Sequence, residues 1–228
     1  LLAQADPYSF SRLDIGNGLS NNQVNCFYRD NKGFLWIGTL SGLNRYDGYQ
    51  FKIFRHDLKD TNSLAENFVS RILEGPHDKI WVETKTLFSI LDLRTEKVTR
   101  NIQAALTELG ISGTTVSDIR RRAGGTYWFL MDRQYLWEYD PATRKAKRVY
   151  SAPASEPVAA FQFDANGLCY VLFLNGRLIW IDTATGKEAG ETDMPGRIFD
   201  GTLLTFQIFV DSDNDLWIYS QANNPKGV

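Results

Sequence analysis

An aromatic residue recurs along the chain at nearly constant intervals, and this repeat constrains the fold more than any other feature. The intervals are 45, 47, 42 and 47 residues. Each aromatic follows a hydrophobic stretch and a polar turn, and the first four are followed 11 or 12 residues later by an aspartate. The aromatic residues, called anchor residues below, are Trp36, Trp81, Trp128, Tyr170 and Trp217, and the aspartates are Asp47, Asp92, Asp140 and Asp182.

A strand-rich repeat of about 45 residues is typical of a β-propeller, in which each repeat is one four-stranded blade. In the first repeat, apolar and polar residues alternate from Val24 to Tyr28, as in a half-buried strand. The Asp, Asn and Gly of residues 30–33 suit a tight turn. Further strands are expected at 35–39, 43–47 and 51–55, which together make one antiparallel sheet.

The chain is therefore expected to be all-β, with about four and a half four-stranded antiparallel blades of an incomplete ring. A propeller ring has roughly four to eight blades. The fifth repeat supplies only its first two strands. Blades are expected near residues 24–56, 68–100, 116–150, 158–190 and 205–228.

One segment departs from the strand pattern. Between residues 101 and 112, Ile102, Leu106 and Leu109 are spaced as on one face of a helix, and Gly110 follows as a stop. We expect a short helix between the second and third blades.

The anchor residues have two interpretations. A large ring at the same point of every second strand fills the space between neighbouring blades, where it buries roughly 150–250 Å². A row of sugar-stacking rings is the alternative. Recurrence in every blade favours packing, because ligand contacts usually break a repeat. Trp137 and Trp180 do break it, but both fall in third strands and are expected to pack within sheets.

Charge argues against contact with nucleic acid, since the formal net charge is −2 and binding a duplex requires a clustered basic surface. The basic clusters at residues 120–122 and 144–148 fall at predicted turns and are expected to be solvated. The alternative for these clusters is a surface for an anionic ligand, such as a sulfated or uronic sugar.

The two cysteines are expected to be free, buried thiols. Cys26 falls in the first strand of the first blade and Cys169 in the second strand of the fourth. That separation should exceed the ~7 Å between Cα atoms that a disulfide allows.

No catalytic or metal site can be assigned. His56 and His77 lie in no spaced ligand motif and are expected to be exposed. Residues 211–215 resemble the start of a calcium loop, but Leu216 and Ala222 stand where such a loop needs Gly and Glu. We therefore interpret these residues as the turn of a first hairpin. We expect no catalytic activity, no cofactor and no metal, and the ligand-binding residues are unknown.

The first five residues, Leu-Leu-Ala-Gln-Ala, resemble the end of a secretory signal peptide. Residues 6–228 would then be the N-terminal part of the propeller domain. No stretch approaches the ~20 apolar residues of a membrane-spanning helix.

The first repeat resembles a known family. The segments Asn17–Val24 (NGLSNNQV), Gly33–Thr39 (GFLWIGT) and Gly42–Gly48 (GLNRYDG) are similar to the opening of the two-component regulator propellers. Over residues 10–56 the pattern is specific. Later repeats diverge from it, with Val82-Glu83-Thr84 in place of Ile-Gly-Thr and Tyr170 in place of Trp.

This resemblance implies the periplasmic sensor region of a hybrid two-component histidine kinase from Bacteroidetes. Such sensors carry two seven-bladed propellers, a β-sandwich domain, one membrane span that anchors them in the inner membrane, a histidine kinase, receiver domains and a DNA-binding output. They detect oligosaccharides, act as homodimers and regulate polysaccharide-utilisation genes. Our chain would be a fragment of one, an incomplete ring of a seven-bladed propeller, touching the membrane only through C-terminal parts that it lacks.

Two other function classes stay open. One is a propeller enzyme, a polysaccharide lyase or glycosidase, although nothing in the sequence places two carboxylates across a cleft. The other is a scaffold for protein contacts.

Overall fold

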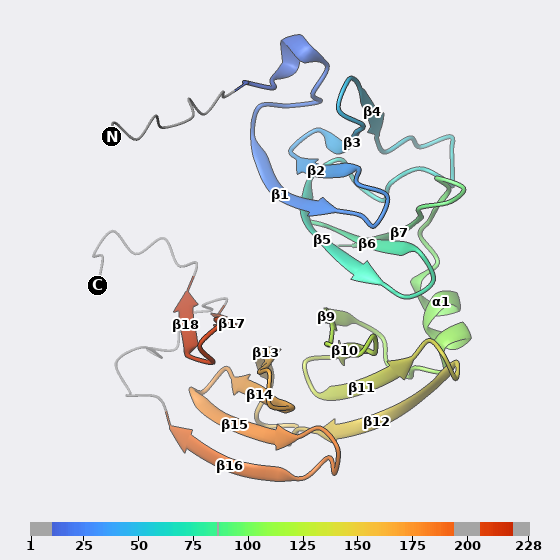
Figure 1. The fold of residues 1–228 in the computed structure, drawn as a ribbon. Helices are drawn as coiled ribbons and strands as arrows, with labels where there is room; N and C mark the ends of the chain where they lie inside the picture. Colours follow the sequence, from blue (N-terminus) through green and yellow to red (C-terminus); the bar gives the residue numbers. More distant parts are fainter. Residues whose placement is uncertain (1–10, 86, 194–205, 221–228) are drawn as a thin grey trace, which may run out of the picture. The chain divides into compact units, whose positions relative to one another are not determined.

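The computed structural model describes residues 11–85, 87–193 and 206–220 (Figure 1). Within them, four sheets have four strands and a fifth has two, and in every sheet each strand pairs with its neighbour in the chain. All the pairings recorded between these strands are antiparallel, as between β1 (Val24–Arg29) and β2 (Leu35–Thr39). The prediction of an all-β chain of propeller blades is confirmed.

The remaining elements follow the predicted order. The first blade adds β3 (Gly42–Tyr46) and β4 (Phe51–Phe54); the second has β5 (Val69–Gly75), β6 (Lys79–Thr84), β7 (Phe88–Asp92) and β8 (Val98–Thr99); the third has β9 (Val116–Arg121), β10 (Tyr127–Met131), β11 (Tyr135–Asp140) and β12 (Lys145–Ser151); the fourth has β13 (Val158–Phe163), β14 (Leu168–Phe173), β15 (Arg177–Asp182) and β16 (Glu188–Asp193); the fifth has β17 (Phe206–Val210) and β18 (Leu216–Ser220).

Two helices accompany the strands within the described residues. The predicted helix is α1 (Ile102–Leu109), and Gly110 follows it at φ 72°, a left-handed conformation that suits glycine at a helix end. A single 3-10 turn, η1 (Ile15–Asn17), precedes the first blade. The predicted signal-peptide remnant at residues 1–5 lies outside the described residues.

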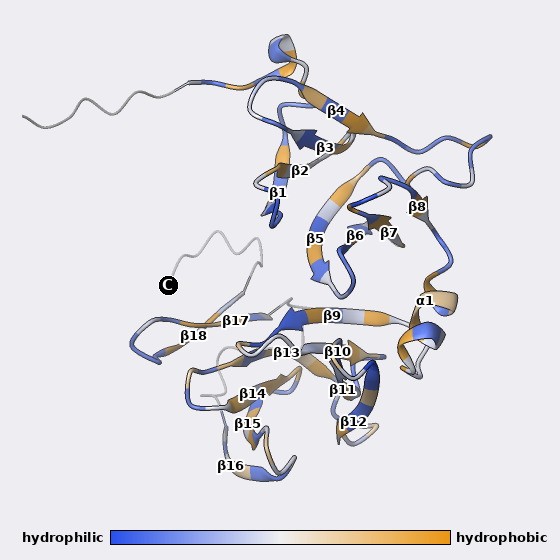
Figure 2. Ribbon diagram, turned by 45° about the vertical axis from the view of Figure 1, so that its right-hand side comes forward, coloured by the Kyte–Doolittle hydropathy of each residue, from blue (hydrophilic) through white to orange (hydrophobic). Residues whose placement is uncertain are grey.

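The chain divides into two compact units. The first comprises residues 1–73 and 78–102, and the second residues 74–77 and 103–228. Each has its own apolar core. Figure 2 shows hydrophobic and hydrophilic residues interspersed along β1 and β5. Along β1, half-buried and exposed residues alternate, so the two faces of that strand have different surroundings.

Three anchor residues are fully buried, as the packing interpretation requires. Trp36 and Trp81 are 1% exposed and Trp128 is 0% exposed. In the first unit, Trp36 shares a core with Leu43 and Val69. The fifth anchor residue, Trp217, departs from the series because it is 59% exposed.

A set of hydrogen bonds, which we call the aspartate clasp, joins the first hairpin to the anchor residue in the first and fifth blades. In the first blade, Asp30 Oδ1 accepts from the backbone N–H groups of Lys32 and Phe34, both at 2.9 Å. Its Oδ2 accepts from the indole Nε1 of Trp36, also at 2.9 Å. One buried carboxylate thus fixes both the turn and the ring that closes the blade interface.

The clasp recurs in the fifth blade, where the sequence resembles a calcium loop. Asp211 accepts from the N–H groups of Asp213 and Asp215 at 3.0 and 2.9 Å, and from the Trp217 indole at 2.7 Å. The indole bond, foremost, lowers the pKa of Asp211 below its ordinary value. The loop is a hairpin turn, as the sequence analysis preferred.

The third blade lacks the clasp. Arg122 occupies the aspartate position, and the backbone turn is the same, since Gly125 N–H donates to the Arg122 carbonyl at 3.0 Å as Gly33 does to Asp30. Trp128 Nε1 is buried and has no hydrogen-bond partner within the described ranges. A buried donor without a partner costs free energy.

The aspartates after the third strands close the next turn of each blade. Asp47 accepts from the N–H groups of Tyr49 and Gln50, both at 2.8 Å. These bonds to the charged form lower its pKa, the Gln50 contact foremost. Asp92, Asp140 and Asp182 each accept at least one backbone N–H of their turn in the same way. The repeated aspartates are therefore turn-forming residues.

We predict that Asp30→Ala lowers the free energy of unfolding by about 1–3 kcal/mol, because it leaves a buried indole N–H and two turn N–H groups without their hydrogen-bond acceptor. Asp211→Ala is the matched control and should cost less, since the Trp217 indole is exposed and can bond to water. Urea denaturation of both variants checks this, and equal losses would contradict it.

We predict that Arg122→Asp stabilises the chain by supplying the absent acceptor for Trp128. One added hydrogen bond, about 1 kcal/mol, corresponds to a rise of about 2–4 °C in Tm for a chain of this size. Arg122→Ala is the control, since it removes the cation without adding an acceptor. An equal rise with alanine would show that loss of the arginine, not the new bond, is responsible.

Candidate functional site: the loop face of the first unit

The candidate site lies on the loops at one edge of the first two blades. In an antiparallel meander, the chain that enters the first strand and the turn joining the second and third strands lie at the same edge. In the first blade these are residues 18–23 and 40–41, and in the second residues 55–68, 85 and 87. Propeller ligands usually meet such loops.

A buried polar network holds the entry loop of the first blade. The Ser20 N–H donates to Asn44 Oδ1 at 2.9 Å, and Asn44 Nδ2 donates back to Ser20 Oγ at 2.8 Å. Ser20 Oγ also shares a 2.8 Å hydrogen bond with Thr39 Oγ1. Asn44 and Thr39 are completely buried. The entry loop, residues 18–23, is thus bound to the two central strands, β2 and β3, and we call it the docked plug. It belongs to the segment that carries the family resemblance.

The second blade repeats the network 45 residues later. The Ala65 N–H donates to Ser89 Oγ at 2.9 Å, and Thr84 Oγ1 donates to Glu66 Oε2 at 2.6 Å. Leu64, the counterpart of Leu19, is completely buried. The sequence repeat was visible, but the partners of these polar residues lie 18 to 24 residues away and were not identified from it.

Arg100 organises the long loop between the two blades. Its Nε donates to the Ser63 carbonyl at 2.8 Å, and its Nη2 donates to the carbonyls of Asp57 and Asp60, both at 3.1 Å. One guanidinium thus satisfies three backbone acceptors of residues 57–63 from the end of β8. The loop is held in one conformation by a residue that is about 40 positions away in sequence.

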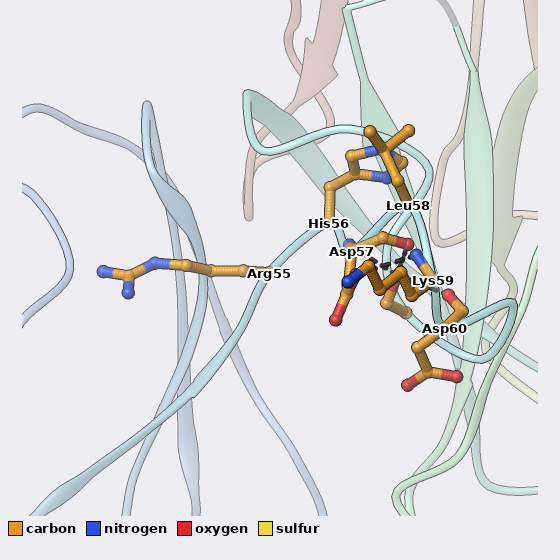
Figure 3. A pocket seen from close by; sticks show the side chains of 7 residues that line it. Arg55, His56, Asp57, Leu58, Lys59 and Asp60 are labelled. Atoms are coloured by element: carbon orange, nitrogen blue, oxygen red, sulfur yellow. Dashed lines mark hydrogen bonds between the residues drawn. The ribbon is translucent and has the colours of Figure 1, made fainter.

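This loop borders an open hollow of about 670 Å³ (Figure 3). Leu58 is 90% exposed beside it. In Figure 3, Arg55 points away from the other labelled side chains, and its Nε donates to the Ser41 carbonyl at 3.1 Å. The lining residues, which mix both charge signs with an imidazole and an apolar side chain, are Arg55, His56, Asp57, Leu58, Lys59, Asp60 and Ser63.

The lining of the hollow presents several polar groups. Ser63 Oγ lies 3.0 Å from the Asp57 carbonyl and 2.8 Å from the Asp60 carbonyl and can donate its one proton to either, so the hydroxyl is used in holding the loop. Asp57 and Asp60 accept the Lys59 and Asn62 N–H groups in their own turns. The remaining carboxylate oxygens, Lys59 and His56 offer donors and acceptors of the kind that recognise hydroxyl-rich ligands.

Both histidines are less exposed than predicted, and the prediction was wrong for both. His56 is half-buried because its Nδ1 is 2.8 Å from the Leu64 carbonyl. In the second unit, His77 is half-buried because its Nε2 is 2.7 Å from the Tyr139 hydroxyl. A turn position alone does not reveal a partner 62 residues away.

The cysteines are free, as predicted, but only one is fully buried. Cys169 is 0% exposed, and burial raises its pKa. Cys26 is half-buried, which corrects the prediction for this residue. Desolvation still raises the Cys26 pKa to about 11, so neither thiol is activated as a nucleophile.

The basic clusters lie mainly in strands, not in turns as predicted. Arg120 and Arg121 belong to β9, and Lys145 to Arg148 lie in β12. Arg120 Nε contacts the buried Asp118 carboxylate at 3.1 Å. Salt bridges such as this one reduce what the clusters can offer to an anion.

The two tryptophans that break the repeat pack as expected. Trp137 lies in β11 and Trp180 in β15, and both are half-buried. The Trp180 ring is 6.4 Å from the Tyr170 ring and lies against Gly190, where an added Cβ would come within 2.3 Å of it. Neither ring projects freely toward a ligand.

The described parts of the chain contain neither a candidate metal site nor a candidate membrane-spanning helix. No group of three or more His, Cys, Asp or Glu side chains is placed to hold a metal ion. No helix there has the length and apolar character needed to cross a membrane.

The blades and their loops define the chain as part of a β-propeller. Residues 18–41, which contain the docked plug and the first anchor residue, match the family model of the two component regulator propeller. This match confirms the resemblance seen in the first repeat.

Comparisons with known proteins agree in fold. The chain is similar to the extracellular domain of a hybrid two component system from B. thetaiotaomicron, with 20% identity, a TM-score of 0.52, and coverage of 93% of this chain and 34% of that one. It is also similar to the β-propeller domain of Cps50 (Swd1) from Myceliophteria thermophila, with 13% identity, a TM-score of 0.55, and coverage of 89% and 63%.

A curated relative, Histidine kinase P4 from Formosa agariphila, is 38% identical over 65 residues, which are 28% of this chain and 5% of the relative. Our chain therefore spans about a third of the length of the B. thetaiotaomicron structure and a small part of the kinase.

We predict that Arg100→Ala frees residues 57–63. Loss of three charge-assisted hydrogen bonds should speed amide hydrogen exchange in this loop by about 10-fold or more, since each such bond contributes on the order of 1 kcal/mol. Arg94→Ala is the matched control, because the Arg94 side chain is 66% exposed. Unchanged exchange in the Arg100 variant would show that the guanidinium does not hold the loop.

Proposed function

We propose that this chain is part of an extracytoplasmic sensor domain of a hybrid two-component histidine kinase. The observation that carries the proposal is the match of residues 18–41 to the two component regulator propeller model. The similarity to a histidine kinase and to an extracellular domain of a hybrid two component system supports it. The domain itself is expected to bind and not to catalyse.

The ligand we propose is an oligosaccharide released from a polysaccharide, and the output is control of polysaccharide-utilisation genes. The hollow beside residues 55–63 supports a hydroxyl-rich ligand, because it combines carboxylates, a lysine and an imidazole with the exposed Leu58. Sugars present both hydroxyl groups and apolar C–H faces, which such a surface can contact.

The complete sensor would be a periplasmic homodimer anchored in the inner membrane. Ligand binding transmits a signal only if the ligand binds one arrangement of the dimer better than the other. A tenfold difference in affinity shifts the equilibrium by about 1.4 kcal/mol.

The test is a screen of plant and host oligosaccharides by thermal shift, followed by calorimetry and an assay for released reducing ends. We expect one class of oligosaccharide to raise the Tm without turnover. Lys59→Ala should weaken binding of that sugar about 10-fold, the effect of losing one charged hydrogen bond. Tyr49→Ala, at the opposite edge of the first blade, should not.

Three results would contradict the proposal. Turnover that a single carboxylate substitution abolishes would indicate a lyase or glycosidase. Binding that Lys59→Ala and Tyr49→Ala leave equally unchanged would place the ligand elsewhere. Absence of binding by every sugar would favour a protein-interaction scaffold.

A further inference from the structure

The Arg55 side chain is held in one position on the loop face of the first unit. Its Nε donates to the Ser41 carbonyl at 3.1 Å. Its stem passes over Gly42, where an added Cβ would come within 3.2 Å of Arg55 Cγ and 2.6 Å of the Phe54 carbonyl. The φ of Gly42, 132°, also favours glycine. Arg55 is thus fixed at two points, so it has less conformational freedom to lose when a ligand binds.

The outer end of the Arg55 side chain is unused. Neither of its Nη groups has a hydrogen-bond or ion-pair partner among the residues that the structure describes. Because Arg55 is exposed and is held through Nε, the two Nη groups are available as paired donors. A guanidinium with two such donors binds two oxygens of a carboxylate, sulfate or phosphate group at once.

Ser41 supplies a further donor beside this guanidinium. Its hydroxyl oxygen accepts from Asn21 Nδ2 at 3.1 Å. The hydroxyl proton has no recorded acceptor in the described ranges, so it is free to donate to a ligand. The Ser41 backbone is fixed as well, because its N–H donates to Thr39 Oγ1 at 3.0 Å. The groups that Arg55 and Ser41 leave unpaired are therefore all donors.

The carboxylates of the hollow do not neutralise the Arg55 cation. In Figure 3, the guanidinium points away from the side chains of Asp57 and Asp60. Both carboxylates accept backbone N–H groups of their own turns, from Lys59 at 2.8 Å and from Asn62 at 2.9 Å. A fixed cation with free donors and no paired carboxylate favours an anion as its partner.

We propose that Arg55 and Ser41 form an oxyanion site at the edge of the hollow, and that the oligosaccharide of the proposed function binds there through a carboxylate or sulfate group. The two Nη groups bind two oxygens of the anion, and the Ser41 hydroxyl donates to it. Uncharged hydroxyl groups of the same sugar face Asp57 and Asp60, which accept from hydroxyl groups and repel a second anion. The site rests on the proposed function and narrows its ligand to an acidic sugar.

The test measures binding to the whole chain by calorimetry, with probes in matched pairs. Trigalacturonate and its methyl ester differ in the charge of the carboxylates, and a carrageenan tetrasaccharide and its desulfated form differ in sulfate. The two pairs thus distinguish a carboxylate from a sulfate as the bound group. The variants are Arg55→Ala, Arg55→Lys and Ser41→Ala, and circular dichroism establishes that each is folded. If Arg55→Ala does not fold, Arg55→Gln replaces it, since glutamine retains a donor for the Ser41 carbonyl.

Arg94→Ala is the matched control. It removes one positive charge from the same unit, and the Arg94 side chain is 66% exposed. A general attraction between the protein and an anion would be weakened equally by the loss of either arginine, whereas a site at Arg55 would not.

We expect the charged member of one pair to bind about 10-fold or more tightly than its uncharged form, as charged hydrogen bonds provide. Arg55→Ala should weaken binding of the charged sugar by roughly 10- to 100-fold and leave the uncharged form unchanged. Arg55→Lys should retain part of the preference, because lysine keeps the charge without the paired donors. Ser41→Ala should weaken binding by about 3- to 10-fold, and Arg94→Ala should have no such effect.

The outcomes separate the oxyanion site from the proposed function. Equal affinity for both members of each pair, or binding of the charged sugar that Arg55→Ala leaves unchanged, would overturn the site while the oligosaccharide sensor stands. Equal losses in Arg55→Ala and Arg94→Ala would also overturn it, because they indicate a general effect of charge. Absence of binding by every sugar would contradict the proposed function and the site together.

Discussion

Burial of a single aromatic ring between successive sheets is the interaction on which the blades depend. A four-stranded sheet with apolar residues on both faces cannot bury them alone, so each blade needs a neighbour. Trp36 and Trp128 are among the largest fully buried side chains and occupy the same point of the second strand. The spacing of about 45 residues follows, because one blade must be completed before the next ring can be placed.

Polar groups decide how each ring and loop is oriented. The aspartate clasp fixes the Trp36 ring, and buried Thr39 and Asn44 fix the entry loop of the same blade. The third blade has Met131 and Leu136 at the corresponding positions, both fully buried. That blade has therefore exchanged hydrogen bonds for apolar contact, which is why its sequence departs from the family pattern while its strands remain in place.

The strands, turns and helix could be predicted because their signals are local: alternation, turn residues and a stop at Gly110. The candidate site could not. Arg100 holds a loop about 40 residues away, and His77 is bonded to Tyr139, 62 residues away. No periodicity encodes such pairs. The anchor residues, of which Trp217 is the fifth, also look uniform in sequence. The exposure of each anchor ring depends on the neighbouring blade and not on the residue itself.

The Arg100-held loop links the candidate site to blade packing. Residues 55–63 border the hollow, and the chain runs from them directly into Leu64, which is buried in the same core as Trp36. A ligand that binds this loop in one conformation better than in another therefore also acts on the contact between the first two blades. By linkage, the ligand can shift that contact only by its difference in binding free energy between the two conformations. Because Arg100 holds the loop rigidly, this difference in binding free energy acts on the contact between the blades. In a mobile loop, the ligand would change only the conformation of the loop itself.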